Sequence, residues 1–252
     1  SDVYKRQSFE TVMMTRLDAK MVDLGLAYDI DHARSLIVAR LVKIAGNIVV
    51  DSGKSVSDDA DIVLVAKPKY VSRGGIKLAG AIERWDLCFE GMTALDVGAS
   101  TGGFTDYLLQ SGIGTIYSLD VGYGQLDYKL RQDDRVVVME RINARRQFTL
   151  PKKVDLLVVD VSFISVLKII PSCLDHLKKS GTIIALIKPQ FEARRDQVGN
   201  NGIVQSAHVH ASVLSKVIVS LMKGGLRLKG LVPSIIKGHG GNQEFFVWFN
   251  RK

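Results

Sequence analysis

The chain has 252 residues, long enough for one large domain or two smaller ones. Hydrophobic residues make up 46% and charged residues 24% of it, a balance that excludes an intrinsically disordered or collagen-like chain. The formal net charge of +8 favours a polyanionic partner, either a nucleic acid or an anionic membrane surface.

Cysteine and histidine usage argues against a disulfide-stabilised or metal-binding protein. Cys88 and Cys173 lie far apart, so we expect neither a disulfide scaffold nor a zinc–cysteine site, and we expect a reducing compartment. His208 and His210 flank a single residue, but no carboxylate or cysteine cluster accompanies them. We therefore expect no metal site.

The apolar runs are too short for a membrane helix. The most hydrophobic stretch, Leu156–Leu167, is interrupted by Asp160. The start of the chain lacks the basic-then-apolar pattern of a signal peptide. These features predict a cytoplasmic protein without a membrane partner, and a monomer is the favoured state.

The first part of the chain predicts two short helices followed by a small sheet. Between Arg16 and Leu41 the apolar residues recur at helical spacing, with one break at Gly25–Ile30. Asp29 or Asp31 can cap the second helix. Two short strands with a tight turn between them are expected next, at Ile44–Val50 and Asp61–Val65.

Basic side chains gather on this first part. Arg34 and Arg40 are expected on the second helix, where they could lie against phosphates. An ordinary solvated charged face is the alternative. The basic residues are Arg16, Lys20, Arg34, Arg40, Lys43 and Lys54.

The same part resembles the S4 domain, a small RNA-binding module. The resemblance rests on Arg16-Leu17-Asp18, Gly25-Leu26, the run Ala33–Ile37 and a hairpin at Val42–Val50 that contains Gly46-Asn47. Arg40 departs from the pattern, which usually has glycine before the hairpin. The resemblance implies RNA binding, with candidate contacts at Arg16, Lys20, Arg34, Ser35, Arg40, Lys43 and, beyond the module, Arg73.

We place the S4-like domain at residues 8–66, a linker at 67–73 and a second domain at 74–252. Pro68 marks the linker because it lacks an amide donor and stops a regular element.

The second domain alternates short apolar runs with helix-like stretches. This pattern predicts an α/β fold with a doubly wound, mainly parallel sheet, behind a small α+β domain. The expected strands are Thr93–Val97, Thr115–Leu119, Arg135–Met139, Val154–Val159 and Thr182–Ile187, and the expected helices include Phe104–Gln110 and Ile164–Leu177.

The first of these strands runs into the glycine-rich turn Leu95–Phe104. Its spacing fits neither the dinucleotide fingerprint nor a phosphate-binding loop. Asp96 comes before the glycines, and a carboxylate there suits a cationic amino group better than a pyrophosphate. Asp120, a little over twenty positions beyond Gly98, can accept hydrogen bonds from ribose hydroxyls. The turn therefore predicts a site for an adenosyl amino acid, with a purely structural turn as the alternative.

This segment resembles the class I methyltransferases, which implies S-adenosyl-L-methionine as the cofactor. On that resemblance the candidate cofactor contacts are Asp96, Gly98, Ala99, Ser100, Gly102, Gly103, Phe104, Asp120, Asn143 and Asp160.

Four further motifs surround this turn in the sequence. Two of them place Asp160 and Lys188 at the ends of successive strands, where the strand ends of a doubly wound sheet converge. The motifs are Ser72–Leu78 (SRGGIKL), Asp155–Ser165 (DLLVVDVSFIS), Leu186–Glu192 (LIKPQFE) and Gly240–Phe246 (GNQEFF after the first glycine).

Taken together, these motifs resemble the FtsJ-like ribose 2′-O-methyltransferases, and the TlyA/hemolysin-A branch in particular. The resemblance implies methylation of a ribose, with cytidine favoured, in ribosomal RNA or ribosomal subunits. It also implies a catalytic tetrad of Lys77, Asp160, Lys188 and Glu244.

The tetrad's residue types suit the chemistry, because a ribose hydroxyl needs a positioned proton acceptor. We expect Lys188 to be the base or main orienter and Lys77 to stabilise the developing negative charge, with the two carboxylates orienting the lysines. Phe163 and Phe191 are expected to pack in the core. The alternative is that they line the site or stack on a base. Weaker phosphate candidates are Arg194, Arg195, Lys237 and His239.

Three other functions stay open on the sequence alone. They are a haemolysin-like membrane-active protein, an RNA-binding protein without catalysis, and a methyltransferase acting on a small molecule.

Overall fold

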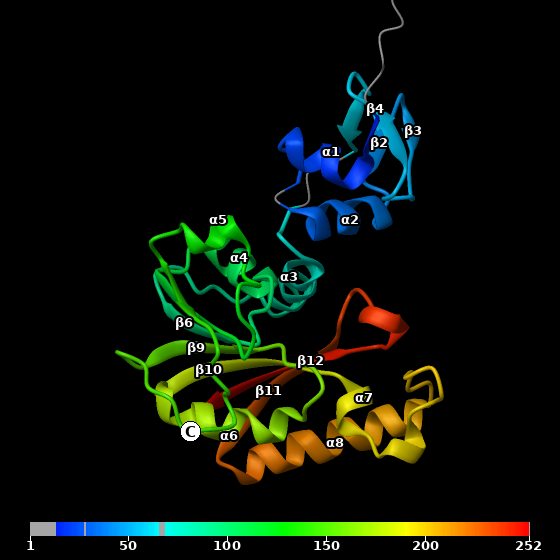
Figure 1. Cartoon of the computed structure of the whole chain (residues 1–252). Helices are drawn as coiled ribbons and strands as arrows, with labels where there is room; N and C mark the ends of the chain where they lie inside the picture. Colours follow the sequence, from blue (N-terminus) through cyan, green and yellow to red (C-terminus); the bar gives the residue numbers. More distant parts are fainter. Residues whose placement is uncertain (1–13, 28, 66–68, 252) are drawn as a thin grey trace, which may run out of the picture. The chain divides into compact units, whose positions relative to one another are not determined.

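The computed structural model describes residues 14–27, 29–65 and 69–251, which belong to two compact units, Ser1–Pro68 and Lys69–Lys252 (Figure 1). The predicted domain start at residue 8, the segment 66–68 and residue 252 lie outside the described residues. Within the described ranges, no helix combines the length and apolar character needed to cross a bilayer.

The first unit packs two helices against short antiparallel strands. Its core contains Leu17, Met21 and Ile37, each fully buried. The strands form two small sheets, ordered β1-β4 and β3-β2-β5. The elements are β1 (Met14–Arg16), α1 (Leu17–Asp23), α2 (Ile30–Val38), β2 (Val42–Ile44), β3 (Asn47–Ile48), β4 (Ser55–Ser57) and β5 (Ile62–Leu64).

The two helices and the β2–β3 hairpin confirm the sequence prediction for this unit, whereas β1 and β4 were not predicted. Asp29 caps α2, since its carboxylate accepts a hydrogen bond from the His32 amide at 2.7 Å. The prediction that Arg40 lies on α2 was wrong. The helix ends at Val38, and Arg40 has a φ of 61°, the left-handed conformation that turns the chain from a helix into the next strand.

The second unit is built on a seven-stranded sheet with the order β11-β12-β10-β9-β6-β7-β8. Strands β8, β7, β6, β9 and β10 are parallel, and β12 is antiparallel to both β10 and β11. The doubly wound prediction is therefore confirmed. The strands are β6 (Thr93–Val97), β7 (Thr115–Leu119), β8 (Val136–Met139), β9 (Val154–Val159), β10 (Leu177–Ile187), β11 (Leu226–Pro233) and β12 (Phe245–Arg251).

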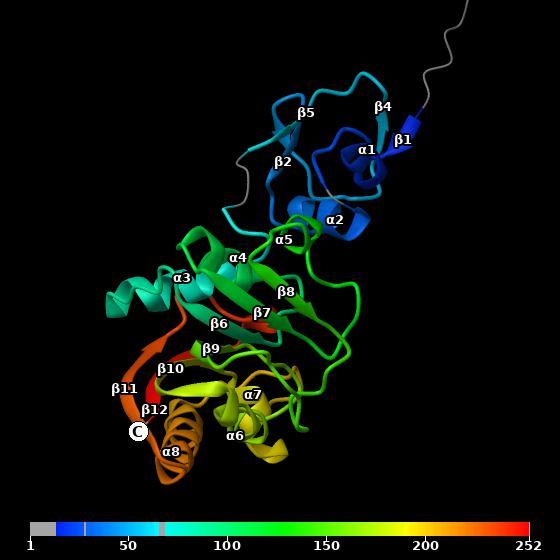
Figure 2. The same cartoon turned by 90° about the vertical axis from the view of Figure 1, so that its left-hand side faces the viewer.

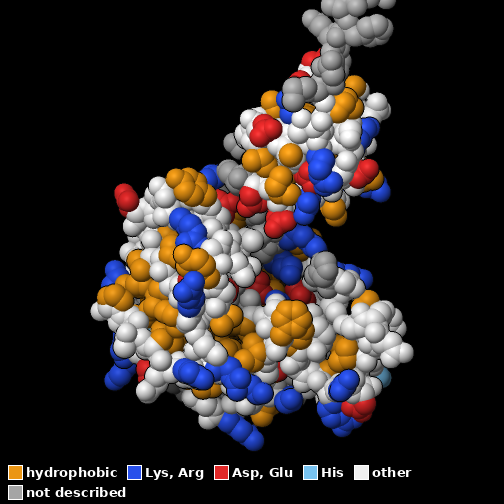
Figure 3. Space-filling view, in the orientation of Figure 1, with side chains coloured by type: hydrophobic (Ala, Val, Ile, Leu, Met, Phe, Trp, Pro, Cys, Tyr) orange, Lys and Arg blue, Asp and Glu red, His pale blue; other side chains and the backbone are white. Residues whose placement is uncertain are grey.

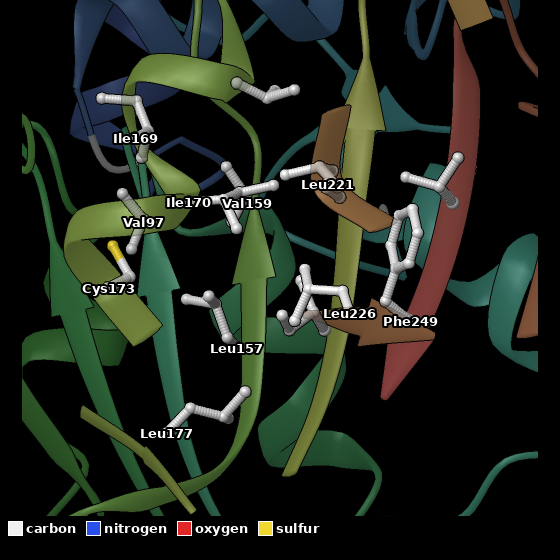
Figure 4. Packing of buried hydrophobic residues seen from close by; sticks show 14 of the residues in the cluster. Val97, Leu157, Val159, Ile169, Ile170, Cys173, Leu177, Leu221, Leu226 and Phe249 are labelled. Atoms are coloured by element: carbon white, nitrogen blue, oxygen red, sulfur yellow. The ribbon is translucent and has the colours of Figure 1, made fainter. Parts of the chain in front are cut away.

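Helices cover both faces of this sheet (Figures 1 and 2). One face packs against α3 (Arg73–Trp85) and α4 (Gly103–Gln110), with α5 (Tyr128–Arg131) beside them. The other packs against α6 (Ile170–Cys173) and α8 (Ala207–Lys223), with α7 (Pro189–Glu192) beside α8. Figure 4 shows this second core, to which Leu157 and Val159 of β9, Ile170 and Leu221 all belong. Because alternate residues of each strand serve the two cores, the central strands are apolar throughout.

One predicted helix was wrong. In place of Ile164–Leu177 the chain forms a 3₁₀ turn (Val166–Lys168), α6 and a second 3₁₀ turn (Leu174–His176). Pro171 explains the break, because it cannot donate to the carbonyl four residues earlier and a new helix begins beside it.

Candidate active site

The glycine-rich turn follows β6 directly. The amides of Gly98 and Ala99 both donate to the Leu119 carbonyl, which ties the turn to the end of β7. Gly98 has a φ of 85°, and a Cβ at this position would lie 2.6 Å from the Asp160 carbonyl oxygen. A side chain is therefore excluded by both backbone conformation and space. The close approach brings the ends of β6 and β9 together.

A pocket opens above this turn at the carboxyl edge of the parallel strands. The predicted site residues in its wall are two lysines and one carboxylate of the expected tetrad, together with most residues of the turn. The complete lining is Ser72, Gly74, Lys77, Gly98, Ala99, Ser100, Thr101, Gly103, Phe104, Asp160, Ser162 and Lys188.

The four residues of the predicted tetrad lie in two pairs of opposite charge. Lys77, in the first turns of α3, donates to Glu244 Oε2 at 2.6 Å, although the two are 167 positions apart in the sequence. Lys188 Nζ lies 2.8 Å from Asp160 Oδ1. Lys77 and Lys188 are each 9% exposed and Glu244 only 2%. Figure 3 shows basic and acidic side chains side by side in a recess of the second unit.

The local chain explains each position of the tetrad. Asp160 directly follows β9 and Lys188 directly follows β10, so adjacent parallel strands deliver them to one edge. Glu244 precedes β12, whose first residue, Phe245, pairs with Ile187 at the end of β10. Lys77 arrives from α3, whose N-cap Ser72 also lines the pocket. The structure therefore brings the four predicted residues to one place.

Comparison with known proteins assigns the family. The profile of the FtsJ-like methyltransferases matches residues 70–251. The chain belongs to the FtsJ-like methyltransferase family. Similar proteins include the 16S/23S rRNA (cytidine-2′-O)-methyltransferase TlyA of Mycobacterium tuberculosis, 40% identical over 92% of this chain and 88% of the relative. Hemolysin A of Brachyspira hyodysenteriae is 38% identical over 93% of this chain and 99% of the relative.

A solved structure has the same architecture. A protein from Streptococcus thermophilus, provisionally named a hemolysin, superposes with a TM-score of 0.75 at 39% identity, covering 96% of this chain and 90% of that one. The similarity thus extends over both units of this FtsJ-like methyltransferase.

Not every predicted cofactor contact of the methyltransferase lines the pocket. Asp96, Gly102, Asp120 and Asn143 are absent from its wall. Asp120 lies close by and is partly exposed, with Oδ2 accepting from the Ser100 amide at 2.8 Å and Oδ1 from the Gly122 amide at 2.7 Å. Asn143 is exposed, and its side chain accepts from the Arg145 amide.

Asp96 is fully buried beneath the turn. Its Oδ2 accepts a hydrogen bond from Thr105 Oγ1 at 2.7 Å, and Thr105 Oγ1 in turn lies 2.8 Å from Ser118 Oγ. Oδ1 has no hydrogen-bond partner among the described residues. Burial is the main cause that raises the pKa of Asp96 to about 7.

Sequence reasoning missed several residues of the pocket wall. Ser162 accepts a hydrogen bond from Lys188 Nζ at 2.7 Å, so it belongs to the surroundings of the reacting group. Ser72, Gly74 and Thr101 also line the pocket. All four lie inside motifs that the sequence already singled out, and their place in these motifs was the available signal.

The prediction that Phe163 packs in the core was wrong. Its side chain is 91% exposed, and it directly follows the pocket-lining Ser162 on the loop after β9. Its φ of 63° is a left-handed conformation that a bulky residue rarely adopts. The Phe163 ring centroid lies 5.1 Å from that of Phe191, which supports it from one side only.

In the first unit, two of the predicted RNA contacts share one buried carboxylate. Arg16 and Arg34 both donate to Asp18, which is 1% exposed, while their own side chains are 56% and 48% exposed. The Arg16 guanidinium is the main cause that lowers the pKa of Asp18 far below its usual range. The carboxylate therefore fixes two guanidinium groups near one another at the surface.

The other predicted RNA contacts have varied surroundings. Lys20 pairs with Asp58 at 2.8 Å, and Ser35 Oγ donates to the His32 carbonyl. Lys43 lies in the middle strand β2 of its sheet. In the second unit, exposed Arg73 donates to the Lys237 carbonyl at 2.5 Å, so it also supports the loop that leads to Glu244.

Proposed function

We propose that this protein transfers a methyl group from S-adenosyl-L-methionine to a ribose 2′-hydroxyl of ribosomal RNA, with cytidine as the favoured nucleoside. The convergence of Lys77, Asp160 and Lys188 on a pocket walled by the glycine-rich turn carries the proposal. The substrate is supported by the TlyA relative, whose name specifies cytidine 2′-O-methylation in 16S and 23S rRNA.

The residues of the turn fit the cofactor. Gly98 and Gly103 let the turn pack closely against Asp160 and Ser72, since a Cβ on either would overlap these neighbours. Asp120 keeps free lone pairs on both oxygens beside Ser100 and can accept from ribose hydroxyls. These residues would hold the nucleoside end of S-adenosylmethionine, which supplies an electrophilic methyl group when it is bound.

The tetrad supplies a proton acceptor and electrostatic stabilisation. Asp160 is the more open carboxylate, with its side chain 21% exposed against 3% for Glu244, so the hydroxyl would enter beside Lys188. Lys188 would be the base or main orienter of the hydroxyl, and Asp160 and Ser162 fix the direction of its Nζ. Lys77 stabilises the developing charge on the oxygen, and Glu244 holds Lys77 in place.

The first unit would supply RNA affinity as an S4-like domain. The paired guanidinium groups of Arg16 and Arg34 suit a phosphate, because their planar forks match its oxygens. Exposed Phe163 offers a stacking surface for a base that has left its helix, since aromatic rings are the common partners of unstacked bases.

Replacing Lys188 tests this function. We expect Lys188→Ala to lower methyl transfer to ribosomal subunits by about a hundredfold or more, because a positioned base typically contributes this much. Transfer of tritiated methyl groups measures the rate, and calorimetry should show cofactor affinity within about twofold of wild type, because Lys188 is not expected to hold the cofactor. Lys223→Ala, an exposed lysine in the last turn of α8, is the matched control. If Lys188→Ala transferred methyl groups at the wild-type rate, the tetrad would have no part in the mechanism.

A further inference from the structure

A short segment after β10 is fastened to the loop after β9 at three points. The segment is Lys188–Glu192, formed by Lys188 and α7, and the loop is residues 160–166. Lys188 contacts Asp160 and Ser162, and the Phe191 ring lies 5.1 Å from Phe163. The third point is Glu192, which the proposed chemistry does not use.

Glu192 is a buried carboxyl group with two partners, both at the far end of this loop. Its Oε2 accepts from Ser165 Oγ at 2.6 Å, and its Oε1 accepts from the Val166 amide at 2.7 Å. The residue is 5% exposed, and this burial is the main cause that raises its pKa. Burying a carboxyl group costs free energy unless hydrogen bonds compensate.

The loop needs such an anchor because its own geometry is unfavourable. It has no regular secondary structure between Val161 and Ser165, and Phe163 sits in a left-handed conformation that is unfavourable for a residue with a Cβ. At its start, the Asp160 amide donates to the Val97 carbonyl at 3.0 Å. At its end, Glu192 holds Ser165 and Val166.

We propose that Glu192 is a positioning residue for the methyl transfer: it anchors the 160–166 loop so that Asp160 and Ser162 meet Lys188 while Phe163 is held outward. This inference rests on the proposed function. Glu192 is not part of the pocket wall and forms no hydrogen bond with the tetrad in the described part of the chain. It acts through the loop that carries two partners of Lys188.

The test compares two substitutions at the same position. Glu192→Ala removes both acceptors, and we expect kcat to fall by about tenfold to a hundredfold, since misplacing a reacting group by about 1 Å can cost a hundredfold. Cofactor affinity should stay within about twofold of wild type. In Glu192→Gln the amide oxygen can still accept from Val166 and the amide nitrogen can donate to Ser165 Oγ, so kcat should return to within about threefold of wild type.

Asp155 provides a matched control at the opposite end of β9. Its carboxylate likewise accepts from one backbone amide, that of Thr93, and from one side chain, that of Lys178. Asp155→Ala should lower thermal stability while leaving kcat near the wild-type value. A Glu192→Ala enzyme with wild-type kcat would overturn the proposal, as would a Glu192→Gln enzyme as slow as Glu192→Ala.

Amide hydrogen exchange separates this inference from the proposed function. If wild-type protein methylates no ribose, the proposed function fails, and exchange at residues 161–167 still tests the anchor. We expect faster exchange there in Glu192→Ala and recovery in Glu192→Gln; equal exchange in all three proteins would overturn the anchor. Should Glu192→Ala not fold, Ser165→Ala takes its place; it removes the bond to Oε2 together with the acceptor of the Leu167 amide, so severalfold lower kcat and faster exchange at residues 161–166 are expected. Wild-type behaviour of Ser165→Ala in both measurements would then overturn it.

Discussion

At the scale of single residues, burial decides the protonation state of Asp96. The carboxyl group has one hydrogen-bond donor, Thr105, and is sealed beneath the glycine-rich turn. Because its pKa is raised to about 7, near neutral pH the carboxyl is partly protonated. The sequence suggested that this group faces a cationic amino group of the cofactor. That role stays a prediction, and in the structure the carboxyl group also supports the turn through its bond with Thr105.

This state predicts a particular dependence of stability on pH. The folded protein releases the Asp96 proton near pH 7 and the unfolded chain near pH 3.8, so between these values unfolding releases a proton. The contribution of Asp96 therefore favours folding at low pH and is lost as the pH rises to about 7 and above. A shift of about three pKa units corresponds to about 4 kcal/mol.

Asp96→Asn cannot titrate and isolates this contribution. Between pH 4 and pH 8, we expect the free energy of unfolding of wild type to fall relative to that of Asp96→Asn, by up to about 4 kcal/mol. Urea unfolding followed by tryptophan fluorescence measures it, since both tryptophans, Trp85 and Trp248, belong to the second unit. Parallel pH curves for the two proteins would show that Asp96 is ionised throughout.

At the scale of elements, the sequence predicted best where a segment's own residues determine its structure. Thr93–Val97, Thr115–Leu119 and Val154–Val159 match β6, β7 and β9 to the residue, because strands buried on both faces are continuous apolar runs bounded by turns. The helix predicted across Pro171 did not form as one element, because the prediction followed the apolar spacing and gave too little weight to the proline, which breaks a helix. Strand β10 starts at Leu177 instead of Thr182, since Leu177 pairs with Val154 across a register shift that spacing does not encode.

In the site, too, the sequence predicted what strand topology determines and not what packing between distant segments determines. The ends of β9 and β10 place Asp160 and Lys188 together by topology alone, which the sequence could predict. The contact between Lys77 and Glu244 spans 167 positions, and only the resemblance to a family suggested it. The left-handed Phe163 and the anchor at Glu192 depend on packing between segments and had no signal of their own.

The end of α2 offers a prediction at this scale. Arg40 has the left-handed φ of 61° at a position where the S4 pattern usually has glycine. Arg40→Gly should stabilise the first unit by about 1 kcal/mol, because glycine adopts this conformation without a Cβ penalty. The slowest amides of α2 should then exchange about fivefold more slowly. Arg40→Ala keeps the strain and should show no slowing, and equal exchange in the two variants would contradict the strain at this helix end.

At the scale of the whole molecule, the net charge bears on how the protein would bind the proposed RNA substrate. A net charge of +8 in a chain with 34 lysines and arginines creates a field that attracts RNA whatever its sequence. Such binding releases counterions from the phosphates, so affinity falls linearly with salt on logarithmic axes. The slope reflects the number of phosphates that the protein neutralises, which makes it a measure of how many basic side chains of the first unit bind RNA.

Arg40 and Lys43 are suited to this measurement because, in the described part of the chain, neither forms an ion pair with a buried carboxylate, whereas Arg16 and Arg34 both hold Asp18. We expect the double variant Arg40→Ala/Lys43→Ala to bind a ribosomal RNA fragment more weakly and to reduce the magnitude of the salt slope by about 1.5–2, close to one unit for each phosphate that is no longer neutralised. Fluorescence anisotropy over a range of potassium chloride concentrations measures it, with Lys223→Ala as the charge control. An unchanged slope would mean that Arg40 and Lys43 are solvated and neutralise no phosphate, and RNA affinity would then have to come from other basic side chains.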